Sequence, residues 1–343
     1  MEFAIEKIEN DFKQEILLDI WNDSLPALDA RRINWSYENN PFGKAHVWLI
    51  KDTGANNYFG VCAVFPRKFR LGQIEVNAGI MADLAIKKCY RSLGPVLKLL
   101  RTVISSHNFE TLIGIPNLSA DSVLQRAGFK KFGKMKRFVK VFRLNKTLKS
   151  EIRCNRRPFI SRSIDLYFRS ETNLWKIRNI KKRWNTFSGK TKFGNETDKV
   201  WLSGSRKLGL VGLRERKYMN WRFCEYPYLS YRLFTLCSKN NNCVLGYIIF
   251  FEKNNIFFID DLFVSDFERY FQELMKSFLK FSLEQGADAL SLKLHACTEI
   301  QNHLIGLGFR SFETEQSIVI HPLPHEAVIS KNFLLTVGDF DMS

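Results

Sequence analysis

The chain has 343 residues, a length at which two domains with separate cores are expected. Its hydrophobic content of 45% and aromatic content of 14% exclude an intrinsically disordered protein. The apolar runs are short, and the start Met1-Glu2-Phe3 has no secretory-signal pattern, so we expect no transmembrane segment. Seven cysteines without a C-x-x-C pair argue against zinc and against a disulfide framework. We therefore expect a cytoplasmic protein without a metal.

The net charge of +17 is concentrated in one segment. Between Lys130 and Lys192 there are 21 Lys and Arg against three acids, an excess of 18, so the rest of the chain is close to neutral. Concentrated positive charge attracts anionic partners, such as an anionic acceptor, an acidic carrier protein, a membrane surface or RNA. The Arg-rich stretch Arg153–Arg162 is the expected partner surface, and it lacks the interleaved aromatic residues of an RNA-recognition motif. The alternative interpretation is a solvated linker that binds nothing in particular.

The first half of the sequence alternates between strand and helix patterns. Apolar residues at helical spacing after Gly94 predict an amphipathic helix that packs on a sheet. A later helix is expected to end at Gly128, because glycine readily takes the left-handed conformation of a helix C-cap. The expected strands are Phe3–Ile8, His46–Lys51, Phe59–Phe65, Met81–Ile86, Thr111–Ile115 and Phe138–Phe142, and the expected helices begin at Asp11, follow Gly94 and span Ser119–Arg126.

The second half repeats much of this order, which predicts an α+β fold with a mixed sheet in each half. No element is assigned to the tail, Asn332–Ser343. The expected strands are Ile164–Phe168, Tyr231–Cys237, Val244–Phe251, Ile256–Val264, Ala289–Leu294 and Gln316–Ile320. The expected helices are Arg269–Gln285 and Glu299–Leu307, and helical or loop segments are expected around Trp175–Trp184.

One motif occurs twice. Asn34–Pro41 and Asn220–Pro227 both read N-W-x-aromatic-x-x-x-P, and in each copy a glycine that opens an apolar run follows the tryptophan after 25 positions. An Asp-Leu pair and a closing Gly-Phe complete each copy. The repetition predicts two tandem units related by duplication, residues 1–148 and 149–325, followed by a tail, residues 326–343. Because the tryptophans recur in both units, we interpret them as packing residues.

The segment between the strand Met81–Ile86 and the next helix predicts an anion-binding turn. The first turn of a helix has unpaired backbone N–H groups, and its dipole favours negative charge there. Gly94 allows a conformation that other residues avoid, and the basic side chains add positive charge. A pyrophosphate is the expected ligand. The residues predicted to hold it are Lys87, Lys88, Arg91, Ser92, Leu93, Gly94, Pro95 and Val96.

This turn resembles the R/Q-x-x-G-x-G/A signature of the GNAT acyltransferases. Arg91 and Gly94 match it, whereas Val96 departs from it and Pro95 has no N–H to offer a phosphate. Asn117 and the later Gly-Phe pair resemble the second half of the same domain, so the resemblance covers most of residues 1–142. It implies a GNAT-like fold, acetyl-CoA or another acyl-CoA as cofactor, and Asn117 as a further cofactor-binding residue.

The second unit matches the outline and lacks the turn. Val264–Arg269 contains two acids and no glycine at this place, and acids repel a pyrophosphate. We therefore expect this unit to be degenerate. Proteins with two GNAT domains, one of them degenerate, resemble Fem-type aminoacyl transferases and cell-envelope polysaccharide acyltransferases.

The resemblance also directs attention to catalytic groups. Many GNAT members have a Tyr four residues before the closing glycine as general acid, and here Leu124 stands in that position. We choose Asp83, on the strand beside the turn, as the general base, with a sheet-edge or capping carboxylate as the alternative interpretation. Weaker candidates for the base are Glu75 and His107. Asp260 and Asp261, on the matching strand of the second unit, are candidates for acceptor-binding carboxylates, with a structural role as the favoured interpretation.

Together these features predict an acyltransferase. Its donor is an acyl-CoA or an acyl carrier protein, and its acceptor is an amine or hydroxyl of a sugar or amino compound, held in a groove between the units. The basic region Lys130–Lys192 is expected to hold an anionic acceptor or carrier. One alternative is a Fem-like transferase that uses aminoacyl-tRNA, for which tRNA would be the partner. The other is a non-catalytic GNAT-like binding protein. The sequence identifies neither the acyl group nor the acceptor.

Overall fold

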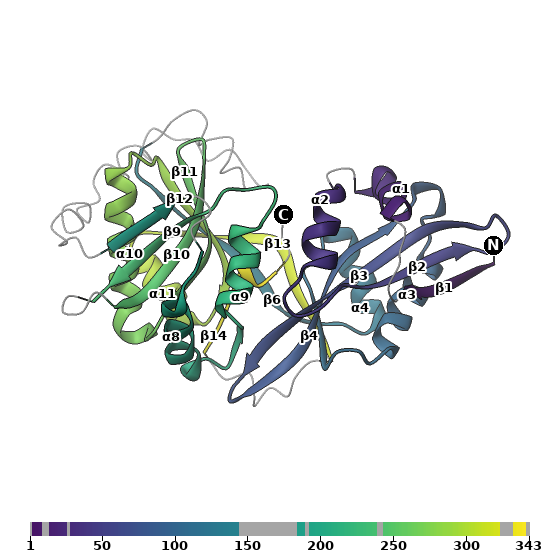
Figure 1. Ribbon diagram of the computed structural model, residues 1–343, viewed down its shortest axis with the longest axis horizontal. Coiled ribbons are helices and arrows are strands. Elements are labelled where there is room, and N and C mark those ends of the chain that lie inside the picture. The colour runs from purple at the N-terminus through teal and green to yellow at the C-terminus, as the bar shows by residue number, and fades with distance from the viewer. Residues whose placement is uncertain are drawn as a thin grey trace.

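The structure consists of two halves that share one continuous sheet (Figure 1). This computed structural model describes residues 2–8, 14–25, 28–143, 184–188, 192–238, 243–322 and 332–340. The strand expected at Ile164–Phe168, most of the segment Trp175–Trp184 and the Arg-rich Arg153–Arg162 lie outside these residues. No helix in the described ranges is long and apolar enough to cross a membrane.

The first half confirms the predicted order of elements, and four of its strands are longer than expected. Its elements are β1 (Phe3–Ile8), α1 (Gln14–Ser24), α2 (Ala30–Arg32), the π-helical η1 (Ile33–Glu38), β2 (His46–Asp52), β3 (Asn57–Leu71), β4 (Ile74–Ile86), η2 (Lys88–Tyr90), α3 (Leu93–Ser105), β5 (Thr111–Gly114), α4 (Leu118–Ala127) and β6 (Lys130–Val141).

The second half follows a similar order, and its tail, unassigned from the sequence, forms a strand and a short helix. Its elements are β7 (Trp184–Ser188), α8 (Asn195–Gly204), η3 (Ser205–Lys207), β8 (Leu210–Gly212), α9 (Arg216–Met219), the π-helical η4 (Asn220–Cys224), β9 (Arg232–Cys237), β10 (Val244–Lys253), β11 (Ile256–Val264), α10 (Phe267–Glu284), β12 (Ala289–Ala296), α11 (Thr298–Gly306), β13 (Arg310–His321), β14 (Phe333–Thr336) and η5 (Val337–Asp339).

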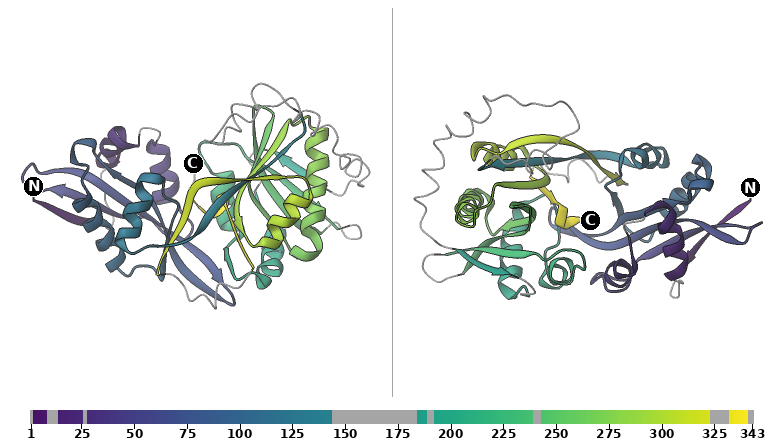
Figure 2. Two further views of the ribbon diagram at one scale, coloured as in Figure 1. Left: turned by 180° about the vertical axis from the view of Figure 1, so that it is seen from behind. Right: turned by 90° about the horizontal axis from the view of Figure 1, so that it is seen from above.

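The two halves exchange their last long strands. The sheet runs in the order β1-β2-β3-β4-β5-β13-β6-β12-β11-β10-β9-β7. The C-terminal part of β13 pairs with β5 of the first half, and β6 pairs with β12 of the second. Figure 2 shows β6 and β13 passing between the halves. Each half thus completes its sheet with a strand from the other half, a feature absent from the sequence prediction; the division near residue 148 stays a prediction.

In the first half, helices cover both faces of the sheet. On one face α1 buries Leu17, Ile20 and Trp21 against β2, β3 and β4. On the other face α3 and α4 bury a second cluster, which includes Leu99 and Leu124. These two clusters use alternate residues of β2, because successive side chains of a strand point to opposite faces. Helix α4 ends at Gly128 with φ of +116°, which confirms the predicted C-cap.

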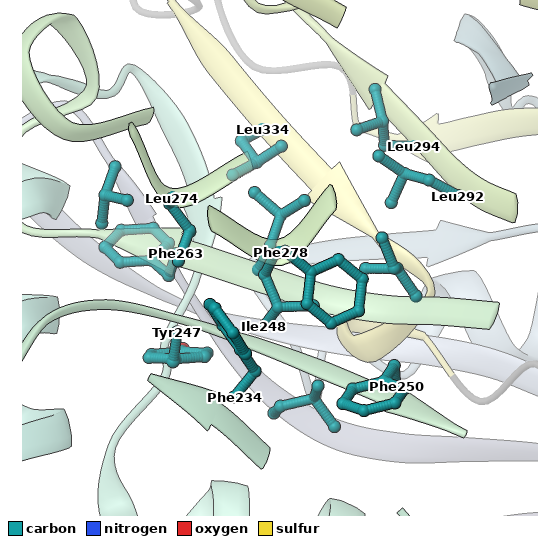
Figure 3. Close-up of a cluster of buried hydrophobic side chains, with 14 of the residues drawn as sticks. Phe234, Tyr247, Ile248, Phe250, Phe263, Leu274, Phe278, Leu292, Leu294 and Leu334 are labelled. Atoms are coloured by element: carbon teal, nitrogen blue, oxygen red, sulfur yellow. The ribbon is translucent and has the colours of Figure 1, made fainter. Parts of the chain in front are cut away.

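The core of the second half is rich in aromatic rings (Figure 3). Phe278 of α10 contacts Phe234 and Phe250 of two neighbouring strands, with ring centroids 5.2 and 5.0 Å apart in T-shaped geometry. Edge-to-face pairs of this kind each contribute about 0.5–1.5 kcal/mol beyond the area they bury. This packing fixes α10 on the sheet.

The two halves meet at the repeated motif. Trp35 and Trp221 stack with centroids 4.5 Å apart and planes 9° from parallel. Each indole N–H donates to the main-chain carbonyl of the other tryptophan, at 2.9 Å in both directions. Both rings are buried, and each lies in a π-helical segment, η1 or η4. The motif therefore serves the interface between the halves, in keeping with the packing interpretation.

Candidate functional site

A wedge opens between β4 and β5 in the first half. The two strands pair in parallel from Ala78 opposite Thr111 to Met81 opposite Gly114, where β5 ends. Strand β4 continues to Ile86 without β5 beside it. Unpaired backbone N–H and C=O groups on a strand edge are available to form hydrogen bonds with another chain or a ligand. An extended ligand with amide groups can pair with this edge of β4.

A β-bulge bends β4 at the wedge. Its register with β3 shifts between Val61, which is opposite Ala85, and Ala63, which is opposite Ala82. Asp83 lies within the shift and has φ of +51°. A non-glycine residue in this region costs of order 1–3 kcal/mol, and such positions cluster at functional sites. The surrounding contacts must therefore hold Asp83 in place.

Those contacts come from Arg32, two positions before the first tryptophan motif, and from Tyr37 within it. The guanidinium of Arg32 donates to both carboxylate oxygens of Asp83, from Nε at 2.9 Å and from Nη2 at 2.8 Å. The hydroxyl of Tyr37 donates to the same carboxylate at 2.7 Å. The side chains of the ion pair are 2% and 6% exposed. This geometry gives Asp83 a role in fixing the bulge, and its role as general base stays a prediction.

The basic turn after β4 is held by acids of α1. Lys87 Nζ lies 2.5 Å from Asp19, and the backbone N–H of Lys88 donates to Asp23 at 2.6 Å. This backbone hydrogen bond is the main reason why the pKa of Asp23 lies below its usual value. Arg91 Nε donates to the carbonyl of Ile86 at 3.3 Å. The side chains of Lys88 and Arg91 are exposed.

The turn leads into the N-terminus of α3. Ser92 is the N-cap, and its side chain makes no capping hydrogen bond. Leu93 and Gly94 are exposed, whereas Pro95 is buried and contributes no N–H. A Cβ atom added to Gly94 would meet nothing within 4 Å, and this glycine has no left-handed φ. Neither packing nor backbone geometry requires glycine here, so the free space is available to a ligand.

The remaining candidates from the first half lie apart from this turn or are used by the fold. Asn117 is the N-cap of α4, and its oxygen accepts from Ala120 N–H at 2.9 Å and from Ser119 at 2.8 Å. Leu124 packs in the core below α4 and brings no hydroxyl to the site. Glu75 forms an ion pair with Arg70 at the β3–β4 hairpin, and His107 is exposed after α3.

The corresponding wedge of the second half is filled by the chain itself. Strand β11 pairs with β12 only over Ile256–Ile259. Further along β12, at Leu294–Ala296, the pairing partner is β14. At the start of α10, the carboxylate of Asp266 accepts from Arg269 N–H at 3.2 Å. Here a strand and an acid of the protein occupy the places that are open in the first half. The statement that the second half binds no CoA in this way stays a prediction. Two structural features support it: the strand β14 and the carboxylate of Asp266.

A buried ion-pair network fixes this C-terminal segment. Arg214 Nη2 lies 2.9 Å from Asp261 and 2.8 Å from Asp339, and Thr336 donates to Asp261 at 2.6 Å. The three charged side chains are at most 1% exposed. Asp261 is thus paired inside the protein. Asp260 accepts from the hydroxyl of Tyr231 at 2.7 Å, and burial raises its pKa.

Comparison with known proteins identifies the fold. No family model and no curated protein matches the sequence itself. A probable N-acyltransferase from Enterococcus faecalis has a TM-score of 0.66 at 9% identity, and the match covers 93% of this chain and 72% of that one. A GCN5-related N-acetyltransferase (GNAT) from Anabaena variabilis gives 0.62 at 14% identity, with the same coverage. The chain has a GNAT-type fold. N-Myristoyltransferase from Saccharomyces cerevisiae, solved with bound myristoyl-CoA, matches at a TM-score of 0.57 and 10% identity, over 93% of this chain and 78% of that one.

The GNAT fold predicted from the turn is therefore confirmed. The turn follows β4 where the sequence placed it, and the functional roles of the turn and of Asp83 stay predictions. Sequence reasoning missed the contacts of Asp83 with Arg32 and Tyr37 and the strand β14 that fills the second wedge. Tyr37 is the aromatic position of the first tryptophan motif and Arg32 stands two positions before it, so the motif was the available signal. No sequence pattern marked β14, since four residues that pair with distant strands have no periodicity of their own.

Proposed function

We propose that this protein is an acyltransferase that binds an acyl thioester in the wedge of its first half. The observation that carries the proposal is the open edge of β4 leading directly to the exposed N-terminus of α3. A pantetheine chain has two amide groups that suit a strand edge, and its phosphate end suits a helix N-terminus. Lys88, Arg91 and the space beside Gly94 are the features of this chain that fit the phosphates.

The chemistry follows from this placement. An amine or hydroxyl of the acceptor attacks the thioester carbonyl, the C–N or C–O bond forms, and the C–S bond breaks with loss of the thiol. Backbone N–H groups of β4 beyond Met81 suit the developing oxyanion, because they are fixed in place before the reaction. Asp83 is our proposed base, and its partners Arg32 and Tyr37 set the bulge that shapes this edge. A water molecule is sufficient to protonate the leaving thiolate where Leu124 replaces a tyrosine.

For the acceptor we propose an anionic sugar or amino compound that enters from the second half. A cavity of about 690 Å³ lies where β6 leaves β12, and Lys131, Lys134 and Lys136 line it together with His295 and Phe333. These lysines belong to the described part of the basic segment. Lys131 and Lys136 pair with acids at 3.2 and 3.4 Å, whereas Lys134 is exposed.

The test is calorimetric titration of acetyl-CoA into the native chain and into an Arg91→Glu, Gly94→Glu variant. Both new acids lie at a helix N-terminus, where a carboxylate stabilises the helix by about 0.3–1 kcal/mol, so the variant is expected to fold. We expect micromolar binding to the native chain and at least a hundredfold loss in the variant. The control is Arg269→Glu at the start of α10, which should bind like the native chain. Absence of binding to the native chain would contradict the proposal that acyl-CoA is the donor.

A further inference from the structure

A basic groove runs along α3, starting at the proposed donor turn. Its volume is about 720 Å³. At a rise of about 1.5 Å per residue, the stretch from Gly94 to Ser106 is about 18 Å long, which matches about 12 residues of a second helix. The buried ring of Trp48 belongs to the groove wall opposite α3. The lining residues are Trp48, Gly94, Leu97, Lys98, Arg101, Thr102, Ser105 and Ser106.

Among the residues that the structure describes, no acid pairs with the basic side chains of this groove. Helix α3 contains Lys98 and Arg101 and no acidic residue, and no acid lines the groove. Lys98 Nζ lies 4.9 Å from the ring centre of Phe3, and within the described ranges neither Lys98 nor Arg101 forms an ion pair. The chain from Leu84 to Arg143 as a whole has 13 Lys and Arg against two acids. The surface beside the donor turn therefore favours an acidic partner.

Two exposed leucines begin the neighbouring helices α3 and α4, and Leu93 directly follows the N-cap of α3. Leu93 and Leu118 are the first residues of α3 and α4 and are 41% and 63% exposed. Apolar side chains between basic ones are typical of protein interfaces. Non-specific single-stranded nucleic-acid sites instead use aromatic side chains on which bases stack, and the one ring in this groove, Trp48, is 1% exposed. The combination favours a protein over RNA.

We propose that this groove docks an acidic helix of an acyl carrier protein, which delivers its acyl-phosphopantetheine arm into the wedge. This inference rests on the proposed function and names the carrier of the donor. Pro95 supports it, because a proline in the first turn of α3 leaves fewer N–H groups for phosphate than a helix normally offers. The carrier arm has a single phosphate, whereas CoA has a pyrophosphate and a further phosphate. The acidic surface of the carrier then supplies the rest of the attraction.

The experiment compares two charge-reversed variants of the full chain. Lys98→Glu with Arg101→Glu changes the groove and leaves the turn at Lys88–Gly94 intact. The matched control, Lys217→Glu with Lys276→Glu, makes the same change of charge at exposed positions of the second half. Each is titrated with octanoyl acyl carrier protein, the apo carrier and acetyl-CoA at two salt concentrations. We expect the groove variant to bind both carrier forms at least tenfold more weakly and acetyl-CoA within twofold of native, and we expect native carrier binding to weaken with salt.

The alternative outcomes separate this inference from the proposed function. If acetyl-CoA binds the native chain and neither carrier form does, the carrier proposal is wrong and the donor site stands. If the groove variant binds acetyl-CoA and the carrier more weakly by the same factor, the groove is part of the CoA-binding site and the carrier proposal is also wrong. If neither donor binds and tRNA binds through Lys98 and Arg101, both proposals are overturned in favour of a tRNA-dependent transferase.

Discussion

Replacing Asp83 with Asn should destabilise the protein through the bulge of β4. The Arg32–Asp83 pair is buried on both sides, and loss of one partner of such a pair costs about 3–5 kcal/mol because the other charge is left uncompensated. Asn tolerates the positive φ of this position and can still accept from Tyr37, so we expect about 3 kcal/mol. At roughly 2 °C per kcal/mol, the melting temperature falls by about 6 °C.

The assay is urea unfolding of the native chain, Asp83→Asn, Arg32→Gln and the double variant. Because the double variant places two neutral amides side by side, it should cost less than the sum of the single changes, with a coupling of about 2 kcal/mol within the range for contacting pairs. Glu38→Gln, which removes an exposed ion pair with Lys44, should change the unfolding free energy by less than about 1 kcal/mol. An Asp83→Asn protein as stable as the native chain would refute this reasoning, and one that is stable but inactive would assign Asp83 to catalysis alone.

Three further predictions concern the second half and the interface. Calorimetry should give one molecule of acetyl-CoA per chain, since β14 fills the second wedge; a stoichiometry of two would contradict this. Burial lowers the pKa of His295 to about 4, so its stabilising effect is complete above pH 6.5 and is lost as the pH falls from 6.5 towards 4. His295→Asn should therefore reduce the loss of stability between pH 7 and 4 by up to about 3 kcal/mol in parallel denaturant titrations, and an unchanged pH profile would argue against it. Trp35→Phe and Trp221→Phe should each cost about 1–3 kcal/mol, because each leaves a buried carbonyl without its indole donor, and unequal unfolding free energies would show that the two hydrogen bonds are not equivalent.

Local patterns predicted the elements of this fold well because each depends on residues close in sequence. The strand Phe3–Ile8 was predicted with the bounds that the structure shows. The cap at Gly128 could be predicted because only glycine takes its φ without strain. The turn at Lys87–Gly94 was found for the same reason, since strand, basic turn and helix are consecutive in the chain.

Features that depend on distant residues were missed. Strand β3 extends past Phe65 to Leu71, where it pairs with β4 on one edge and, over Phe69–Leu71, with β8, more than 130 residues later, on the other. The partner of Asp83 is Arg32, 51 positions away, and no local rule connects them. The exchange of β6 and β13 could not be predicted from periodicity either, since both strands have the same pattern whichever sheet they join.

The exchanged strands join the two halves of this chain into one structural unit. Strand β5 forms one side of the proposed donor wedge, and its other edge pairs with β13, which follows α11 of the second half. The second half therefore stabilises β5, the strand that ends at the wedge. The corresponding wedge of the second half is filled by β14. Strand β14 in turn pairs with β8, and β8 pairs with the end of β3. The second half thus contributes a strand beside the proposed donor wedge, which would give a physical reason for its presence if, as we predict, it binds no donor itself.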